Sequence, residues 1–138
     1  MDYYKKIFAK VCKYKSKKFR SHLERDFAKY LDKNHIEWEY EKYKFELLER
    51  KEYIDQLDGK KHILRGIFYT PDFYIPELDL IVEIKGTWFD KRLFNLKLQL
   101  FKRKYPDRKI VIIKSREEFK KVKEIKNRTE ENGREKQN

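Results

Sequence analysis

The residues best placed to do chemistry lie in one stretch, residues 71–86, with the sequence PDFYIPELDLIVEIKG. Glu83 and Lys85 stand two positions apart in an apolar run with strand character, so their side chains leave the same face of the strand. Charged side chains inside such a strand cost free energy to bury. A compensating partner is therefore expected beside this pair.

A turn at residues 76–79 brings a second carboxylate to the same patch. If Ile75 pairs with Leu80 across this turn, the residues farther along each strand pair in succession. Asp72 then lies opposite Glu83, with the two Cβ atoms about 4.5–5.5 Å apart on one side of the sheet. Two carboxylates and one ammonium group are therefore expected in one small patch.

Two carboxylates held this close repel each other, and a cation between them removes the repulsion. Mg²⁺ prefers oxygen ligands and commonly takes one or two carboxylates together with water and phosphate oxygens. Lys85 would position or deprotonate a water there, or stabilise charge on a phosphate. A metal at this place lowers the pKa of its water and polarises the phosphate. Asp72, Glu83 and Lys85 therefore predict hydrolysis of a phosphodiester bond.

The alternative is that Asp72, Glu83 and Lys85 form an ion-paired cluster at a solvent-facing edge, because Lys and Glu commonly alternate on exposed strands. The context favours a site. An apolar strand leads into Glu83, Gly86 follows Lys85, and a helix comes next.

A helix is predicted to begin at Ser21 and to end at Asn34, with an apolar face at helical spacing. Glu24 has two interpretations. It is either the reciprocal partner of Ser21 in a capping box, or a further carboxylate near the sheet that binds metal or orders water.

Three antiparallel strands are expected after this helix. Residues 36–48 alternate in polarity and indicate a strand with a bulge or bend near Glu41. Residues 58–59, Asp-Gly, are typical of a hairpin turn, from which a second strand returns over residues 61–75. Residues 78–84 form a nearly unbroken apolar run, which predicts a central strand covered on both faces.

The apolar period changes after Gly86. Apolar residues recur at helical spacing from Phe94 to Tyr105, and Pro106 ends that helix. Residues 109–114, KIVIIK, predict a short buried strand. The order helix, three strands, helix, strand, helix predicts an α/β fold with a mixed central sheet flanked by helices.

Ser115 and Glu118 fit a second capping box that opens a last helix. Residues 127–138 are polar without periodicity and predict a disordered tail. Residues 1–20 are basic with interspersed aromatics and predict an N-terminal arm or an extra helix. Residues 21–126 are left as the single folded domain.

The chain has 36 Lys and Arg against 24 Asp and Glu, a net charge of +12. This excess predicts a polyanionic partner, with nucleic acid ahead of a membrane surface. The single cysteine, Cys12, excludes an internal disulfide and a multi-cysteine zinc site. No apolar run reaches the length of a bilayer span or has the form of a signal peptide, so we expect a cytoplasmic location.

These motifs resemble the PD-(D/E)XK, or restriction-endonuclease-like, nuclease superfamily. Pro71-Asp72 matches its first element and Glu83-Ile84-Lys85 its second. The helix with Ser21-His22-Leu23-Glu24 is similar to the first helix of that superfamily, which commonly carries a Glu. The resemblance covers residues 21–114 and implies a restriction-endonuclease-like αβββαβ core.

The resemblance implies an endonuclease dependent on Mg²⁺ or Mn²⁺. Asp72 and Glu83 would bind the metal with the backbone carbonyl of Ile84, Lys85 would serve the nucleophilic water, and Glu24 would be a further catalytic carboxylate. The segment that follows is similar to small nucleases of phages and mobile elements. These include Holliday-junction resolvases, intron-homing endonucleases and transposon-end-cleavage subunits.

Basic side chains near the predicted site would hold DNA by neutralising phosphates and releasing counterions. We expect this role of Lys91, Arg92, Lys97, Lys102, Arg103, Lys104, Lys17 and Lys18. Trp88 and Phe89 would touch the substrate or cover the core.

The expected partner is DNA, either duplex or branched, and no membrane. Cutting two strands is simplest with two sites, so a homodimer is possible. A phage or mobile element in a bacterial host is the expected origin. The alternative function is a non-catalytic nucleic-acid-binding module that keeps the nuclease fold.

Overall fold

A four-stranded mixed sheet lies at the centre of the computed structural model, which describes residues 11–86 and 90–137. The strand order is β10–β9–β8–β3, with β8 antiparallel to β3 and β9, and β10 parallel to β9. The bounds are β3 (Glu39–Tyr40), β8 (Phe73–Ile75), β9 (Leu80–Ile84) and β10 (Lys109–Ile113).

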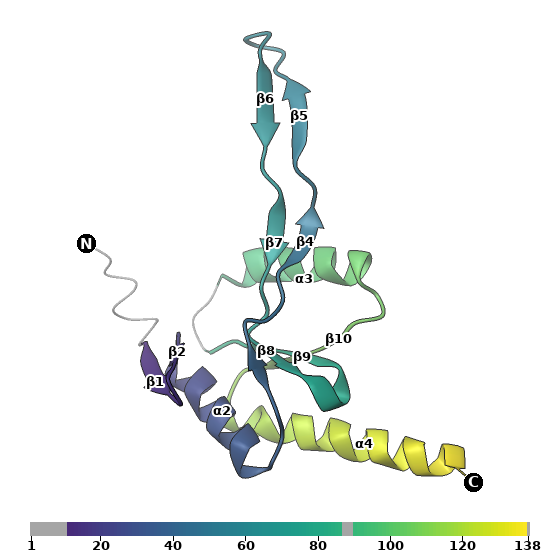
Figure 1. Ribbon diagram of the computed structural model, residues 1–138. Coiled ribbons are helices and arrows are strands. Elements are labelled where there is room, and N and C mark those ends of the chain that lie inside the picture. The colour runs from purple at the N-terminus through teal and green to yellow at the C-terminus, as the bar shows by residue number, and fades with distance from the viewer. Residues whose placement is uncertain (1–10, 87–89, 138) are drawn as a thin grey trace.

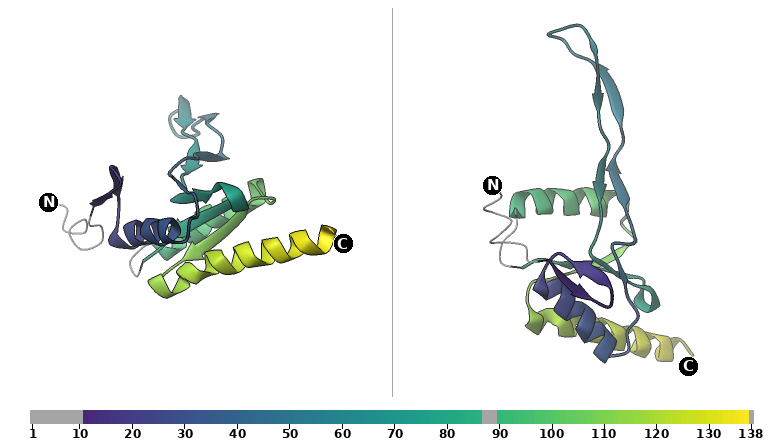
Figure 2. Two further views of the ribbon diagram at one scale, coloured as in Figure 1. Left: turned by 60° about the horizontal axis from the view of Figure 1, so that its bottom comes forward. Right: turned by 60° about the vertical axis from the view of Figure 1, so that its left-hand side comes forward.

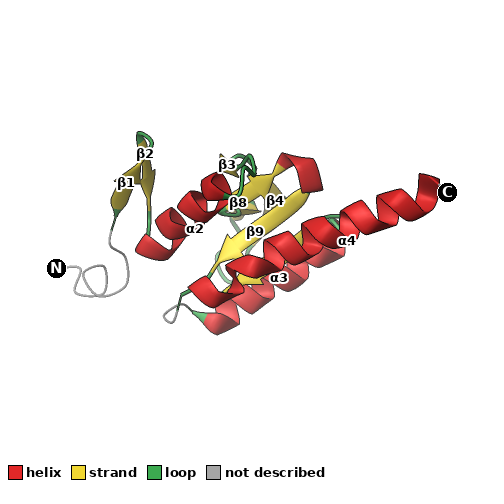
Figure 3. Cartoon of the chain, turned by 90° about the horizontal axis from the view of Figure 1, so that it is seen from below, coloured by secondary structure: helices red, strands yellow, loops and turns green. Residues whose placement is uncertain are grey.

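Helices cover both faces of this sheet (Figures 1 and 3). The helices α2 (His22–Lys33) and α4 (Lys120–Gln137) lie on one face, and α3 (Lys91–Lys104) lies on the other. The predicted mixed α/β fold with a central sheet between helices is confirmed.

β9 is the central strand because all five of its residues are buried. Leu80, Val82 and Ile84 face the core beneath α2 and α4, and Ile81 faces the core beneath α3. Alternate residues of one strand point to opposite faces, so an unbroken apolar run is what a doubly covered strand requires.

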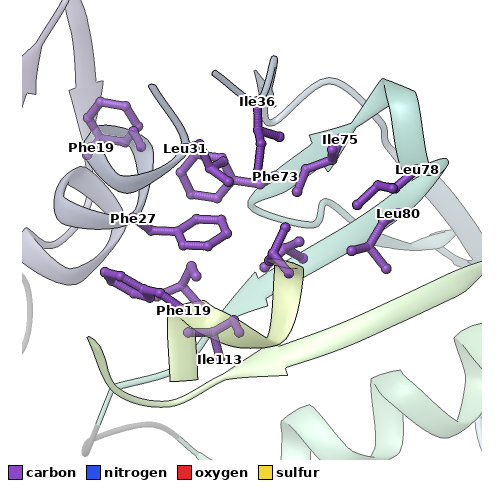
Figure 4. Packing of buried hydrophobic residues seen from close by; sticks show 14 residues of the cluster. Phe19, Phe27, Leu31, Ile36, Phe73, Ile75, Leu78, Leu80, Ile113 and Phe119 are labelled. Carbon is purple, nitrogen blue, oxygen red and sulfur yellow. The ribbon is translucent and has the colours of Figure 1, made fainter. Parts of the chain in front are cut away.

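Aromatic side chains build the larger core (Figure 4). Phe27 from α2 packs edge-on against Phe73 of β8, with ring centroids 5.0 Å apart, and against Phe119 at 5.2 Å. Such pairs add stability beyond the area they bury. On the other face, Phe101 of α3 packs against Phe45 and Tyr69. The strands of the site are therefore held between two packed layers.

A long two-stranded ribbon projects from the body of the molecule (Figures 1 and 2). It consists of β4 paired with β7 and, farther out, β5 paired with β6. The bounds are β4 (Phe45–Leu48), β5 (Lys51–Ile54), β6 (Lys61–Leu64) and β7 (Ile67–Tyr69). The predicted turn at Asp58-Gly59 lies at its tip, where Gly59 has φ +67°, a conformation that glycine adopts without steric cost.

The strand predicted over residues 36–48 has the expected bend near Glu41 but is divided into two strands, and the continuous strand predicted over residues 61–75 is wrong. The first is broken where Glu41 has φ +51°, near the predicted bend. The second is broken between β6 and β7 and again at residues 70–72, where Pro71 lacks the amide hydrogen that a continuous ladder needs. These breaks separate the ribbon from the central sheet.

The N-terminal arm is a hairpin over the residues that the structure describes, so the alternative of an extra helix is wrong there. It consists of β1 (Cys12–Tyr14) and β2 (Lys17–Phe19), and residues 1–10 lie outside the described ranges. Phe19 is fully buried against Phe73. That burial ties the basic arm to the core.

The predicted disordered tail is also wrong, because α4 continues through residue 137. Glu, Lys, Arg and Gln have high helix propensity even where no apolar residues recur at helical spacing. The loss of apolar periodicity after residue 126 therefore marks where α4 stops packing against the core, and the helix itself continues. A 3-10 turn, η2 (Arg116–Phe119), precedes α4, and Ser115 makes no side-chain cap bond. Instead Glu118 accepts from the Lys114 amide at 2.7 Å.

β10 has the predicted position but is a partly exposed edge of the sheet, since only Ile113 of its five residues is buried. Among the described helices, none combines the length and apolarity needed to cross a bilayer.

Candidate active site

The hairpin of β8 and β9 has the predicted register, with Ile75 opposite Leu80 and Phe73 opposite Val82. Asp79 closes the turn in a left-handed conformation, φ +46°. The register places Asp72, just before β8, beside Glu83 of β9. The geometric prediction on which the site was based is therefore confirmed.

Each of the two carboxylates is anchored to the backbone of the other strand. Asp72 Oδ2 accepts from the Ile84 amide at 2.8 Å, and Glu83 Oε2 accepts from the Asp72 amide at 3.3 Å. Both side chains are buried, with 7% and 4% of their surface exposed. Their orientation is set by the strands and not by flexible side-chain packing.

These residues line one open pocket of about 480 Å³ between the sheet, the base of the ribbon and the first turns of α3. Of the predicted site residues, the pocket is lined by Glu24, Asp72, Glu83, Ile84, Lys85 and Lys97. Residues more than 70 positions apart in sequence therefore meet at one cavity.

Two further groups hold Glu83. The Tyr69 hydroxyl donates to Glu83 Oε2 at 2.5 Å, and Lys85 Nζ lies 3.4 Å from Glu83 Oε1. The Lys85 ammonium also lies over the ring of Phe94 at 4.8 Å. Lys85 is thus held at the pocket wall by a carboxylate and an aromatic face.

Each of the two interpretations of Glu24 is correct for one part of the residue: its backbone amide is capped by Ser21, and its carboxylate lies at the site pocket. Its amide donates to Ser21 Oγ at 3.1 Å, which is the expected N-cap bond. Its carboxylate does not return to Ser21, because Oε2 accepts from the Arg20 amide at 3.0 Å and from the Tyr40 hydroxyl at 2.7 Å. The carboxylate is therefore turned towards the pocket, where it is 6% exposed.

Burial raises the pKa of the Asp72 carboxyl well above its usual range, and the charges of Glu83 and Glu24 raise it further. Burial also raises the pKa of Glu24. The Ile84 amide and Lys85 only partly offset the effect at Asp72. The pocket thus concentrates negative charge that nearby protein groups leave incompletely compensated.

A divalent cation fits the donor atoms of this pocket. Asp72 Oδ1 accepts no hydrogen bond from the described residues, and the partner of Glu83 Oε1 within them is the Lys85 ammonium. Within those residues no three His, Cys, Asp or Glu side chains form a complete ligand group. Mg²⁺ commonly binds through one or two carboxylates with water and phosphate filling the other positions, so two oxygens suffice.

The predicted DNA-binding residues are distributed unevenly around the site. Lys97 lines the site pocket, and Lys91 lines a neighbouring one that shares Phe94 with it. Arg92, Lys102, Arg103 and Lys104 are exposed on α3, where Lys104 lies 3.5 Å from Glu46.

Lys17 and Lys18 lie on the N-terminal hairpin. Lys17 lines a different pocket and stacks over Trp38 at 5.0 Å, so it is not part of the site pocket. Trp88 and Phe89 lie outside the described residues.

Three residues of the site escaped sequence reasoning: Tyr69, Tyr40 and Arg20. A buried tyrosine needs a partner for its hydroxyl, and this requirement was the signal available for Tyr69, three residues before Asp72. Burial and then the charge of Glu83 raise the pKa of the Tyr69 phenol, so it donates throughout the physiological range.

Tyr69→Phe is expected to lower the free energy of unfolding by about 1.5–3 kcal/mol, the range for a hydrogen bond to a charged group. The substitution removes the donor to the buried Glu83 carboxylate. Urea unfolding at neutral pH measures the change. Tyr74→Phe is the matched control, since its hydroxyl bonds Asp79 at the surface; an equal effect of both substitutions would contradict the assignment.

Comparison with protein-family models, curated proteins and solved structures found no match for the chain, so the function must be argued from the site itself.

Proposed function

We propose that the protein is a divalent-metal-dependent endodeoxyribonuclease. The observation that carries the proposal is the convergence of Asp72, Glu83 and Lys85 on one open, negatively charged pocket. Burying charged residues without full compensation costs stability, and a binding function gives a reason to keep them.

In this proposal Asp72 Oδ1 and Glu83 Oε1 hold Mg²⁺ or Mn²⁺, with the backbone carbonyl of Ile84 as a further ligand. Bound metal would polarise the phosphate and lower the pKa of a coordinated water. Lys85, at 3.4 Å from Glu83, positions the attacking water or stabilises the charge on the phosphate. Glu24, which lines the same pocket, would order water there.

The restriction-endonuclease-like core belongs to the same proposal. α2 corresponds to the first helix of such a core, β8 and β9 to its central hairpin, and α3 with β10 to its crossover. The parallel pairing of β10 with β9 supports this correspondence, as does the position of Glu24 on α2 facing the same pocket as Glu83. The ribbon is then an extension between β3 and β8.

DNA would lie across the mouth of the pocket and along α3. That helix has 14 residues and is about 20 Å long, with Arg92 and Lys97 near the site and three consecutive basic residues in its last turn. The proposal includes a cytoplasmic setting, an origin in a phage or mobile element, and duplex or branched DNA as the substrate.

The direct test is cleavage of a panel of substrates in Mg²⁺: linear duplex, four-way junction, flap, single strand and RNA. We expect cleavage of at least one DNA substrate, abolished by excess EDTA. Salt-sensitive binding without cleavage in Mg²⁺ or Mn²⁺ would instead establish a non-catalytic binding module.

Lys97→Ala is expected to weaken DNA binding equally for all sequences and to reduce the slope of log affinity against log salt by about 1. The reason is that Lys97 faces the pocket and would neutralise one phosphate. Fluorescence anisotropy at several salt concentrations measures the slope. Lys123→Ala on α4 is the control, as this exposed residue lies outside the pocket; an equal loss in both variants would contradict the placement.

A further inference from the structure

The outer half of the ribbon exposes apolar side chains that nothing in the described chain covers. Leu57 at its tip is 99% exposed, and Ile54, Ile63 and Leu64 on its strands are each more than half exposed. Ile54 and Ile63 share one face of the ribbon and Leu64 lies on the other, as the pairing of β5 with β6 requires. An isolated two-stranded hairpin is marginally stable in water, and apolar side chains this exposed on it favour an interaction site. The ribbon therefore needs a partner.

An apolar groove of about 630 Å³ lies farther down the same ribbon, towards the body. Its floor is formed by Leu47, Leu48, Leu64 and Ile67. Four cations and one carboxylate surround this floor: Arg50, Lys51, Arg65, Lys104 and Glu49. Within the described residues, no carboxylate lies within ion-pair distance of Lys51 or Arg65.

The tip of the ribbon has the complementary character. Leu57 stands between two acids, Asp55 and Asp58. Asp55 Oδ1 accepts from the amides of Leu57 at 2.7 Å and Asp58 at 3.3 Å, so the turn presents its leucine in a fixed conformation. Asp58 is already bound by the Lys60 amide at 2.8 Å and by His62 Nε2 at 2.7 Å. The Asp55 carboxylate beside Leu57 is therefore the negative charge that would meet the positive rim of the apolar groove.

We propose that the tip of each ribbon docks in the groove of a second copy of this chain. The two features are separated by about seven residues, from Arg50 in the groove to Leu57 at the tip, or roughly 20–23 Å of extended chain. A two-fold axis near the Tyr53–His62 pair, which stacks at 5.6 Å in the middle of the ribbon, would lay two ribbons antiparallel. The tip of each copy then reaches the groove of the other copy, which is the self-complementary arrangement of an isologous dimer.

Nucleic acid is the competing occupant, since a two-stranded ribbon also fits a DNA groove. The charges favour protein. Glu49, Glu52, Asp55 and Asp58 nearly balance the cations of the ribbon, and Glu52 already pairs with Arg50 at 3.2 Å and Lys61 at 2.7 Å. A surface built to follow phosphates would be uniformly basic. The dimer does not depend on the proposed cleavage chemistry.

Sedimentation velocity of the full chain without DNA or metal tests the proposal. We expect a dimer for the wild type and for Val11→Asp, a control at an exposed apolar residue outside the ribbon. Leu57→Asp is expected to weaken dimerisation by at least about tenfold, with an unchanged circular dichroism spectrum because this side chain contacts solvent. A monomeric wild type at about 100 μM, or an undiminished Leu57→Asp dimer, would overturn the proposal.

A charge exchange makes the test specific to the tip and groove. One variant carries Asp55→Asn, Gln56→Lys and Asp58→Asn, which keep the turn acceptors, neutralise both acids beside Leu57 and add a cation. The other carries Lys51→Glu and Arg65→Glu in the groove. Each variant alone should be monomeric, whereas their mixture should dimerise because both contacts of the mixed dimer are complementary. A mixture that stays monomeric overturns the proposed pairing. So does a result in which either variant loses DNA affinity while its mass in sedimentation stays that of the wild type.

Discussion

Glu83→Gln is expected to reduce Mg²⁺-dependent cleavage by about a thousandfold or more while leaving the protein folded. The substitution keeps the shape of the side chain and its acceptor oxygen for the Tyr69 hydroxyl. It removes the negative charge that would hold the cation and that fixes the Lys85 ammonium at 3.4 Å. Single-turnover cleavage at saturating enzyme separates this loss from a loss of binding.

The matched control is Glu77→Gln, on the turn of the same hairpin. Glu77 is exposed and lies 3.6 Å from Lys126, outside the pocket. We expect cleavage by this variant to match the wild type. Undiminished cleavage by Glu83→Gln, or by the wild type in excess EDTA, would contradict the proposed chemistry.

Asp72→Asn is expected to abolish cleavage and, in EDTA at neutral pH, to raise the melting temperature. The buried Asp72 carboxylate is repelled by Glu83 and Glu24, whereas an asparagine still accepts from the Ile84 amide and carries no charge. Removal of an incompletely compensated buried charge stabilises the fold. Function and stability should therefore change in opposite directions at this position.

The pH dependence of the wild type follows from the same raised pKa. The folded state binds the Asp72 proton more tightly than the unfolded state, whose carboxyl titrates near pH 4. Stability is therefore full below that pH and falls as pH rises through the folded pKa. The gap between Asp72→Asn and wild type should widen over that interval in EDTA, and Mg²⁺ should close it at pH 8. A wild type more stable than Asp72→Asn at pH 8 in EDTA would contradict the assignment.

The hairpin of the site was predictable from sequence because its determinants are local. A proline-containing turn and a largely apolar five-residue strand fix the register of β8 against β9, and this register brings Asp72 to Glu83. The helix α2 was predictable for the same reason, with Ser21 and Asn34 at its two ends. Helices and strands whose ends are marked by capping or turn residues can be predicted without knowledge of the fold.

The N-terminal hairpin and the hydrogen bonds of the site depend on contacts between distant residues. Tyr69 reaches Glu83 across 14 positions and Tyr40 reaches Glu24 across 16, so no local pattern marks them. The N-terminal hairpin is held by the packing of Phe19 against Phe73. The bend near Glu41 was predicted from the alternation of polarity, whereas the break at residues 70–72 follows a backbone conformation that this alternation does not encode.

The most direct measurement of the central claim is a crystal structure of the protein grown with Mn²⁺, with anomalous diffraction data. The account predicts a single strong peak between Asp72 Oδ1 and Glu83 Oε1, about 2.0–2.3 Å from each, which disappears in Glu83→Gln crystals. A Mn²⁺ peak only elsewhere, or a pocket that stays free of metal with both carboxylates ionised, would contradict it.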